Sequence, residues 1–147
     1  ETGEKRARPM PAISIVHVEG DLFFGAADLF RTQIQKTSLD PDLRIIILRL
    51  KNARHLDATS VVALEELVQF LRAHDRHVII SGATKEVFRV LKNAGSLEVI
   101  GRENVFLNNA RNPNLSTRYA LKRAQVLLGT TEADIRIFHD PNKDKMK

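Results

Sequence analysis

Hydrophobic positions along the chain change their period several times, and each change marks an expected element. At the centre of residues 43–50 both the odd and the even positions are apolar, which is typical of a strand covered on both faces. We therefore expect this segment to be the central strand of a sheet. Shorter apolar runs at 78–80 and 105–107 predict a second buried strand and an edge strand, and residues 13–18 predict a first strand.

The residues after the first strand predict a hairpin. Glu19, Gly20 and Asp21 have the composition of a tight turn, and the apolar residues 22–24 would form the returning strand. A tight hairpin pairs its strands antiparallel, whereas strands joined through helices can pair in parallel. We therefore expect a small mixed sheet in which an N-terminal hairpin precedes parallel strand–helix units.

Apolar residues at spacings of three and four predict the helices. The clearest stripe consists of Val61, Leu64, Leu67, Val68 and Leu71, with charged residues on the opposite side. Further helices are expected at residues 29–37, 84–93 and 112–128, with Thr84 and Asn112 as N-caps. Because strands and helices alternate with short links, the predicted class is α/β.

The length of 147 residues suits one domain with a real core. We expect a basic flank or linker at 1–11, of which residues 1–3 are a candidate for a vector-derived remnant, and a folded domain at 12–129. Residues 130–147 contain one apolar trio within a charged sequence, which predicts a solvated tail.

Composition then narrows the chemistry. The absence of cysteine excludes disulfides and thiolate sites. The longest aliphatic run, residues 45–48, is far shorter than the about 20 residues of a membrane span, so we expect the isolated chain to be soluble. The net charge of +5 is concentrated at the two ends of the chain. Such basic flanks suit lipid headgroups or an acidic partner, and the lack of interleaved aromatic residues disfavours nucleic acid.

Asp57 stands between the central strand and the next helix and is followed by Ala58, Thr59 and Ser60. A carboxylate at this position caps a helix by accepting hydrogen bonds from the first-turn amides. The carboxyl ends of parallel strands are also where ligands and partners dock, and a helix start offers donors to an anion. Asp57 is therefore predicted to be a cap, and the four residues are a candidate partner-binding or regulatory loop.

Other candidate sites are weaker. Arg111, Arg118, Lys122 and Arg123 give the last predicted helix a basic surface, which is either a solvated face or a contact for an anion or an acidic partner. The residues His74 to His77 include metal-ligand types, but they occupy a predicted loop, so we expect no metal site. No nucleophile elbow, zinc-protease or phosphate-loop motif occurs, so an enzyme is not expected.

The order of elements and three stretches of sequence resemble the STAS domain, a family named for sulfate transporters and anti-sigma factor antagonists. These stretches are LRIIILRLKNARHLD with the helix VVALEELVQFLRAH, then VIISGATKEVFRVLKNAG, and then SLEVIGRENVFLN. The third stretch and the long helix after Asp57 are most similar to the cytoplasmic C-terminal domain of SulP/SLC26 anion transporters. The resemblance implies a STAS-like fold with helices mainly on one face of the sheet.

The chain departs from the anti-sigma antagonists at the loop. In those proteins a hydroxyl residue follows the Asp and is phosphorylated, but here Ala58 holds that position and has no oxygen. Thr59 offers a hydroxyl one place later, and Ser60 replaces the usual glycine. The resemblance therefore favours a transporter domain over a freestanding antagonist, which remains the alternative.

The function expected from the resemblance is regulation by protein contact on the cytoplasmic side of a membrane. Its implied partners are the membrane domain of its own transporter, a second copy in a homodimer, and acyl carrier protein or a nucleotide. Nucleotide binding is implied by the resemblance only, and otherwise no cofactor is expected.

Overall fold

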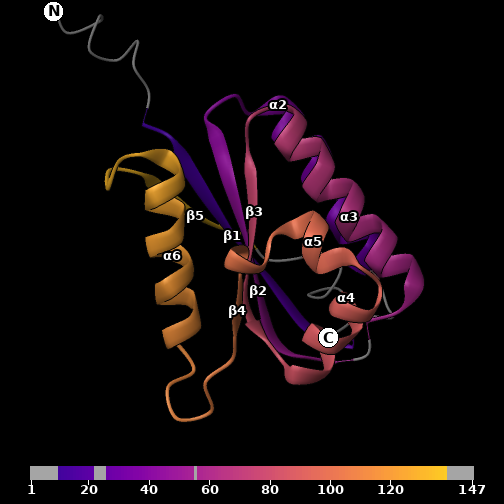
Figure 1. Ribbon diagram of the computed structural model, residues 1–147. Helices are drawn as coiled ribbons and strands as arrows, with labels where there is room; N and C mark the ends of the chain where they lie inside the picture. Colours follow the sequence, from indigo (N-terminus) through magenta and orange to yellow (C-terminus); the bar gives the residue numbers. More distant parts are fainter. Residues whose placement is uncertain (1–9, 22–25, 55, 139–147) are drawn as a thin grey trace, which may run out of the picture.

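The computed structural model describes residues 10–21, 26–54 and 56–138. Strands and helices alternate along most of this length, which confirms the predicted α/β class (Figure 1). The elements in chain order are β1 (Ala12–Asp21), α2 (Ala26–Leu39), β2 (Leu43–Arg54), α3 (Ala58–Ala73), β3 (His77–Ala83), α4 (Lys85–Asn93), α5 (Ser96–Ile100), the 3-10 turn η1 (Arg102–Asn104), β4 (Val105–Leu107), α6 (Leu115–Leu128) and β5 (Asp134–Phe138).

The five strands form one sheet in the order β4-β3-β2-β1-β5, and each neighbouring pair is parallel. The predicted central strand is confirmed, because β2 lies in the middle. Its register aligns Ile15, Ile47 and Ile79 across three strands, so these side chains form one row on a single face.

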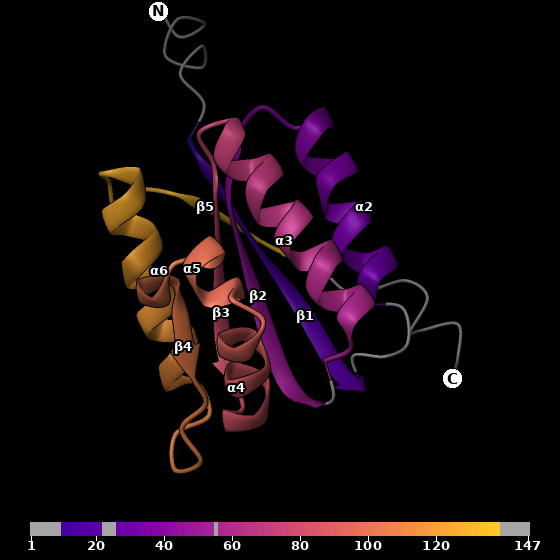
Figure 2. The same cartoon turned by 45° about the vertical axis from the view of Figure 1, so that its right-hand side comes forward.

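Alternate side chains of the strands enter two separate cores. The larger core lies beneath α2, α3, α4 and α5, and it receives Ile46 and Leu48 from β2. The smaller core lies beneath α6, and it receives Ile45 and Ile47. Figures 1 and 2 show α6 alone on its face of the sheet and the other helices on the opposite face. The both-parity apolar pattern of residues 43–50 therefore reflects burial on both faces.

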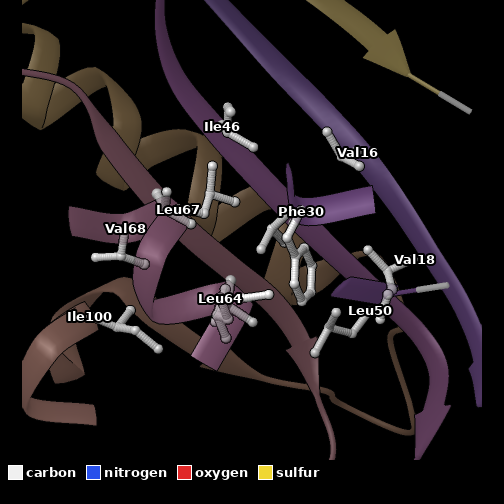
Figure 3. Close-up of a cluster of buried hydrophobic side chains, with 14 of the residues drawn as sticks. Val16, Val18, Phe30, Ile46, Leu50, Leu64, Leu67, Val68 and Ile100 are labelled. Carbon is white, nitrogen blue, oxygen red and sulfur yellow. The ribbon is translucent and has the colours of Figure 1, made fainter. Parts of the chain in front are cut away.

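Helix α3 supplies the main wall of the larger core. The five residues of its predicted stripe are all buried, and in Figure 3 Leu64 and Leu67 lie on the side of α3 toward Phe30 of α2, whereas Val68 lies toward Ile100 of α5. Phe30 is only 1% exposed. The helical period in the sequence is thus explained by packing on one side of the helix.

The predicted hairpin turn is wrong. Glu19, Gly20 and Asp21 belong to β1, which continues alongside β2 as far as the pairing of Asp21 with Arg54. The register shifts between Glu19 and Asp21, and a glycine inside a strand commonly marks such an irregularity. Residues 22–24 lie outside the described residues. All strand pairs that the structure describes are parallel, so the mixed sheet is not found there.

The predicted tail also contains structure. Residues 134–138 form β5, which pairs in parallel with β1 at the edge of the sheet. The amide of Asp134 donates to the carbonyl of Pro11 at 2.9 Å, and the Lys36 ammonium lies 4.1 Å from the centre of the Phe138 ring. An edge strand can be short and partly polar, so its composition resembled that of a solvated segment. Residues 139–147 lie outside the described part of the chain, as do residues 1–9 of the basic flank.

The last long helix begins later than predicted. Asn114 stands at the cap position of α6 and makes no side-chain cap, and Asn112 Oδ1 accepts a hydrogen bond from the Asn114 amide at 3.3 Å, just before the helix. Asn114 Oδ1 instead accepts a hydrogen bond from Arg49 at 3.0 Å. The side chain at the cap position thus makes a long-range contact instead of a local capping bond. The short helix α5 was also not predicted, because its five residues are too few to show a period.

Gln33 provides a test of core energetics. Its side chain is fully buried, and neither its Oε1 nor its Nε2 has a hydrogen-bond partner in the described structure. A buried polar group without a partner costs about 1–3 kcal/mol. We expect Gln33→Met, which keeps the length of the side chain, to raise the free energy of unfolding by about 1–3 kcal/mol in urea titrations. The exposed Gln35 of the same helix is the control, and a rise in Gln35→Met as large as that in Gln33→Met would contradict this explanation.

Alanine substitutions at Gly82 and Gly95 distinguish the cost of backbone strain from the cost of a steric clash. Both have positive φ, at 75° and 78°. A Cβ at Gly82 would lie 2.4 Å from the Leu50 carbonyl oxygen, whereas a Cβ at Gly95 would meet nothing within 4 Å. We expect Gly95→Ala to cost about 1–2 kcal/mol of unfolding free energy, and Gly82→Ala to cost about 1–3 kcal/mol more because the strands must separate. Equal losses in thermal or urea unfolding would show that the contact with Leu50 is unimportant.

Candidate functional site

The predicted cap at Asp57 is confirmed. Asp57 has extended backbone angles, φ −87° and ψ 171°, and its Oδ1 accepts a hydrogen bond from the Ser60 amide at 2.9 Å. Its own carbonyl accepts the first helical bond, from the amide of Val61. Asp57 therefore ends the link from β2 and satisfies one of the free donors at the start of α3.

The same contacts stabilise the ionised form of the Asp57 carboxyl group. Hydrogen bonds from the Ser60 side chain, and then from the Ser60 backbone, lower the pKa of the Asp57 carboxyl below its ordinary value of 3.8. Because the carboxylate occupies the Ser60 amide, that amide is not available to a bound phosphate. The fixed negative charge at the helix start also opposes a second anion there. The Ser60 amide therefore cannot help this loop to hold a phosphorylated group.

The four loop residues differ in accessibility. Ser60 is 2% exposed and Asp57 is half-buried, whereas Ala58 and Thr59 are exposed. One turn along the same helix, Val62 is an apolar side chain with 55% of its surface exposed. Ala58, Thr59 and Val62 together form a surface that we call the α3 edge. The sequence analysis missed Val62, although its position outside the buried stripe was a readable signal.

The four predicted basic contacts are not brought together. Arg118 and Lys122 lie one turn apart on the exposed side of α6, and Arg111 lies in the loop before that helix. Arg123 is half-buried, and its Nε donates to Asn104 Oδ1 at 2.9 Å. It therefore joins α6 to the turn η1, and Arg118 and Lys122 remain as an exposed pair.

The segment from His74 to His77 is a connecting turn with structural contacts. His74 Nδ1 lies 2.8 Å from the Phe70 carbonyl, and Asp75 pairs with Arg44 at 3.3 Å. Burial lowers the pKa of His77, which begins β3. Within residues 10–21, 26–54 and 56–138, no group of three or more His, Cys, Asp or Glu side chains is arranged to hold a metal ion.

The sequence analysis also missed two adjoining hollows at the carboxyl ends of β2 and β3. Their volumes are about 240 and 540 Å³, and both are bordered by Asn108, Ala110 and Ser116. We call them together the α6 cleft. Arg49 and Lys85 also line it, but Arg49 lies within β2 and Lys85 begins α4 after β3, so only the pairing of those strands places them near Ser116. The rule that ligands bind at the carboxyl ends of parallel strands was the available signal.

The described helices include none that is both long and apolar enough to cross a membrane. Fold and site together define an open parallel α/β domain with an exposed helix start at the carboxyl end of its central strand. The chain belongs to the STAS domain family, whose model matches residues 5–111. The resemblance predicted from the sequence is thereby confirmed.

Sequence relatives are sulfate transporters. Sulfate transporter 3.2 of Arabidopsis thaliana is 26% identical over 109 residues, which are 67% of this chain and 17% of the transporter. The putative sulfate transporter YvdB of Bacillus subtilis is 22% identical over 99 residues, which are 67% of this chain and 18% of that protein. The chain thus spans less than a fifth of the length of these relatives.

Solved structures support the same fold. The SulP transporter STAS domain of Vibrio cholerae is 27% identical, with a TM-score of 0.60 over 85% of this chain and 91% of that one. A sulfate transporter family protein of Wolinella succinogenes has a TM-score of 0.67 over 85% of this chain and 95% of its own, at 24% identity. The chain is therefore similar to the STAS domains of SulP-type transporters.

The contacts of Asp57 predict a pH dependence of stability. Because its folded pKa is lowered, ionised Asp57 stabilises the fold above pH 3.8, and this contribution is lost as the pH falls from there through the folded pKa. Asp57→Asn keeps a capping oxygen but does not titrate. We expect the wild type to be more stable than Asp57→Asn at neutral pH and the difference to shrink below pH 3.8 in urea unfolding. A difference that does not change with pH would contradict the assignment.

Proposed function

We propose that this chain is a non-catalytic regulatory and protein-interaction domain of a SulP-type transporter of sulfate or a related anion. The observation that carries the proposal is the α3 edge, an exposed surface beside a capped helix start in a member of the STAS family. The similarity of the chain to less than a fifth of each sulfate transporter supports its being one domain of a larger protein.

A docking role suits the physical character of the α3 edge. Ala58 and Val62 offer apolar area, and Thr59 offers a hydroxyl that can donate or accept. The bond between Asp57 and Ser60 fixes the start of the helix, so little conformational entropy would be lost on binding. These features support recognition, whereas bond-breaking chemistry would need a nucleophile and a base at converging positions.

The proposed partner is the membrane domain of the same transporter, with this chain on the cytoplasmic side of the membrane. The basic residues of the N-terminal flank suit a segment close to anionic lipid headgroups. The exposed pair Arg118 and Lys122 suits an acidic surface on a partner. A homodimer, acyl carrier protein and a nucleotide remain proposals from the family resemblance.

A freestanding anti-sigma antagonist is not favoured. Ala58 has no hydroxyl at the position where that class is phosphorylated, and the sequence relatives named above are transporters. The exposed Thr59 is the hydroxyl in the loop that a kinase could reach, because Ser60 is buried.

The coding sequence upstream of Glu1 tests the transporter assignment directly. We expect it to encode many apolar segments of about 20 residues, because such segments cross a bilayer as helices. A start codon shortly before Glu1 would contradict the assignment and favour the freestanding protein.

The docking role of the α3 edge can be tested in the complete transporter. Val62→Glu places a charge in the proposed contact, and we expect anion uptake into proteoliposomes or the amount of assembled transporter to fall about tenfold. Val126→Glu is the matched control, because Val126 is 69% exposed on α6, outside the α3 edge. If the two variants behave alike while circular dichroism of the isolated domain is unchanged, the α3 edge is not the docking surface.

A further inference from the structure

The two edges of the sheet differ in regularity. β4 ends one side with only three residues, and its register with β3 shifts between Ser81 and Ala83. β5 ends the other side, beyond β1, and the two strands pair without a shift from Asp134 to Phe138 (Figure 2). An unpaired strand edge is a template for another strand, and very short or irregular edge strands protect against such pairing. β4 has this protection, whereas β5 presents a regular edge.

The backbone of β5 directs hydrogen-bonding groups outward at two apolar residues. The Asp134 amide donates to the Pro11 carbonyl, which lies on the β1 side. Because successive residues of a strand alternate in the direction of their N–H and C=O groups, those of Ile135 and Ile137 point away from β1. Among the described strands none lies beyond β5, so these groups face an open position in the sheet.

The side chains of Ile135 and Ile137 form an apolar patch beside α6. They are 51% and 61% exposed. Their partners on β1, Ile13 and Ile15, belong to the core beneath α6, so the patch lies on the α6 face of the sheet. Helix α6 packs mainly on β2, β3 and β4, although both faces of a parallel sheet are normally covered. We call this patch, with the outward backbone groups of the same two residues, the β5 edge.

Asp134 and Arg136 occupy the opposite face of β5. Arg136 Nε donates to Asp134 Oδ2 at 3.0 Å, and its Nη1 pairs with Asp40, which follows α2. Both side chains of β5 remain partly exposed, and Arg136 Nη2 has no partner in the part of the chain that the structure describes. The contact with Asp40 holds β5 in place, so little conformational entropy would be lost when another strand pairs with it.

The charge pattern of β5 is complementary to itself. A twofold dimer requires such a surface, because each contact occurs twice with the two copies exchanged. Antiparallel pairing centred on Ile135 places Asp134 of each copy opposite Arg136 of the other. On the α6 face, Ile135 then lies opposite Ile135, and Ile137 lies opposite Ala133. Centres on Asp134 or Arg136 would instead oppose like charges, which destabilises a strand pair.

We propose that two copies of this chain pair along the β5 edge, antiparallel and centred on Ile135, so that their sheets join into one. The charge complementarity selects a second copy as the occupant, because one strand supplies both members of each ion pair. The short and irregular β4 at the opposite edge ends the assembly at a dimer. The β5 edge shares no residue with the α3 edge, so failure of this proposal would leave the docking role of the α3 edge unaffected.

Sedimentation velocity of the 147-residue chain tests the dimer. We expect a monomer–dimer equilibrium with a dissociation constant of about 1–100 µM, because one strand pair buries less area than a standard interface. The Ile135 and Ile137 amides should gain protection from hydrogen exchange as the protein concentration rises, since they enter the new strand pair. A monomer at every concentration up to about 1 mM, or a dimer that leaves these two amides unprotected, would overturn the proposal.

Exchange of charges tests the register. Asp134→Lys and Arg136→Glu each oppose like charges in a homodimer, so each should raise the dissociation constant about tenfold. A mixture of the two variants restores both ion pairs between unlike copies, and it should form a heterodimer about as tight as the wild-type dimer. This rescue distinguishes a contact between copies from a change in the fold, which circular dichroism of each variant also checks. Two folded variants that do not associate when mixed would show the register to be wrong.

A further pair of variants tests the apolar part of the β5 edge. Ile137→Glu places a charge among the apolar side chains of the interface and should raise the dissociation constant at least about tenfold. Leu107→Glu is the matched control, because Leu107 is 45% exposed on β4 at the opposite edge of the sheet. If Leu107→Glu weakens the dimer as much as Ile137→Glu does, the β5 edge is not the interface.

Discussion

Parallel pairing of β2 with β1 on one side and β3 on the other is the constraint on which the rest of this structure depends. Parallel neighbours cannot be joined by a tight turn, so each connection must travel back across the sheet, here through a helix. The helices then cover both faces, and the strands must be apolar on both parities. The carboxyl ends of all strands consequently meet at one end of the domain.

That shared end carries two long-helix starts with opposite electrostatics. At α3 the carboxylate of Asp57 neutralises the first turn and leaves an exposed surface, of Ala58, Thr59 and Val62, that is suited to another protein. At α6 no side chain caps the helix, and cations with a buried hydroxyl surround a cleft. The two helix starts therefore differ in charge although both are amino ends of α-helices.

The sequence predicted the features that depend on near neighbours. The central strand, the α3 stripe and the cap at Asp57 are each fixed by residues within a few positions of one another, and all three are confirmed. The hairpin turn was wrong, because strand pairing with β2 outweighed local composition, and the pairing of residues 134–138 with β1 was not predicted. The cap predicted at Asn112 is not formed, because the helix begins after Asn114, whose side chain accepts a hydrogen bond from Arg49, 65 positions away.

The sequence by itself therefore determined the class of the fold, the family and the capping of α3 by Asp57, since hydrophobic period and capping are local properties of the backbone. The tertiary structure decided which of the loop hydroxyls is exposed, that Arg123 joins η1, and that Arg49, Lys85 and Ser116 meet around one cleft. Those outcomes depend on burial and on strand order, which bring distant segments together. A linear pattern of residues does not specify distances between such segments.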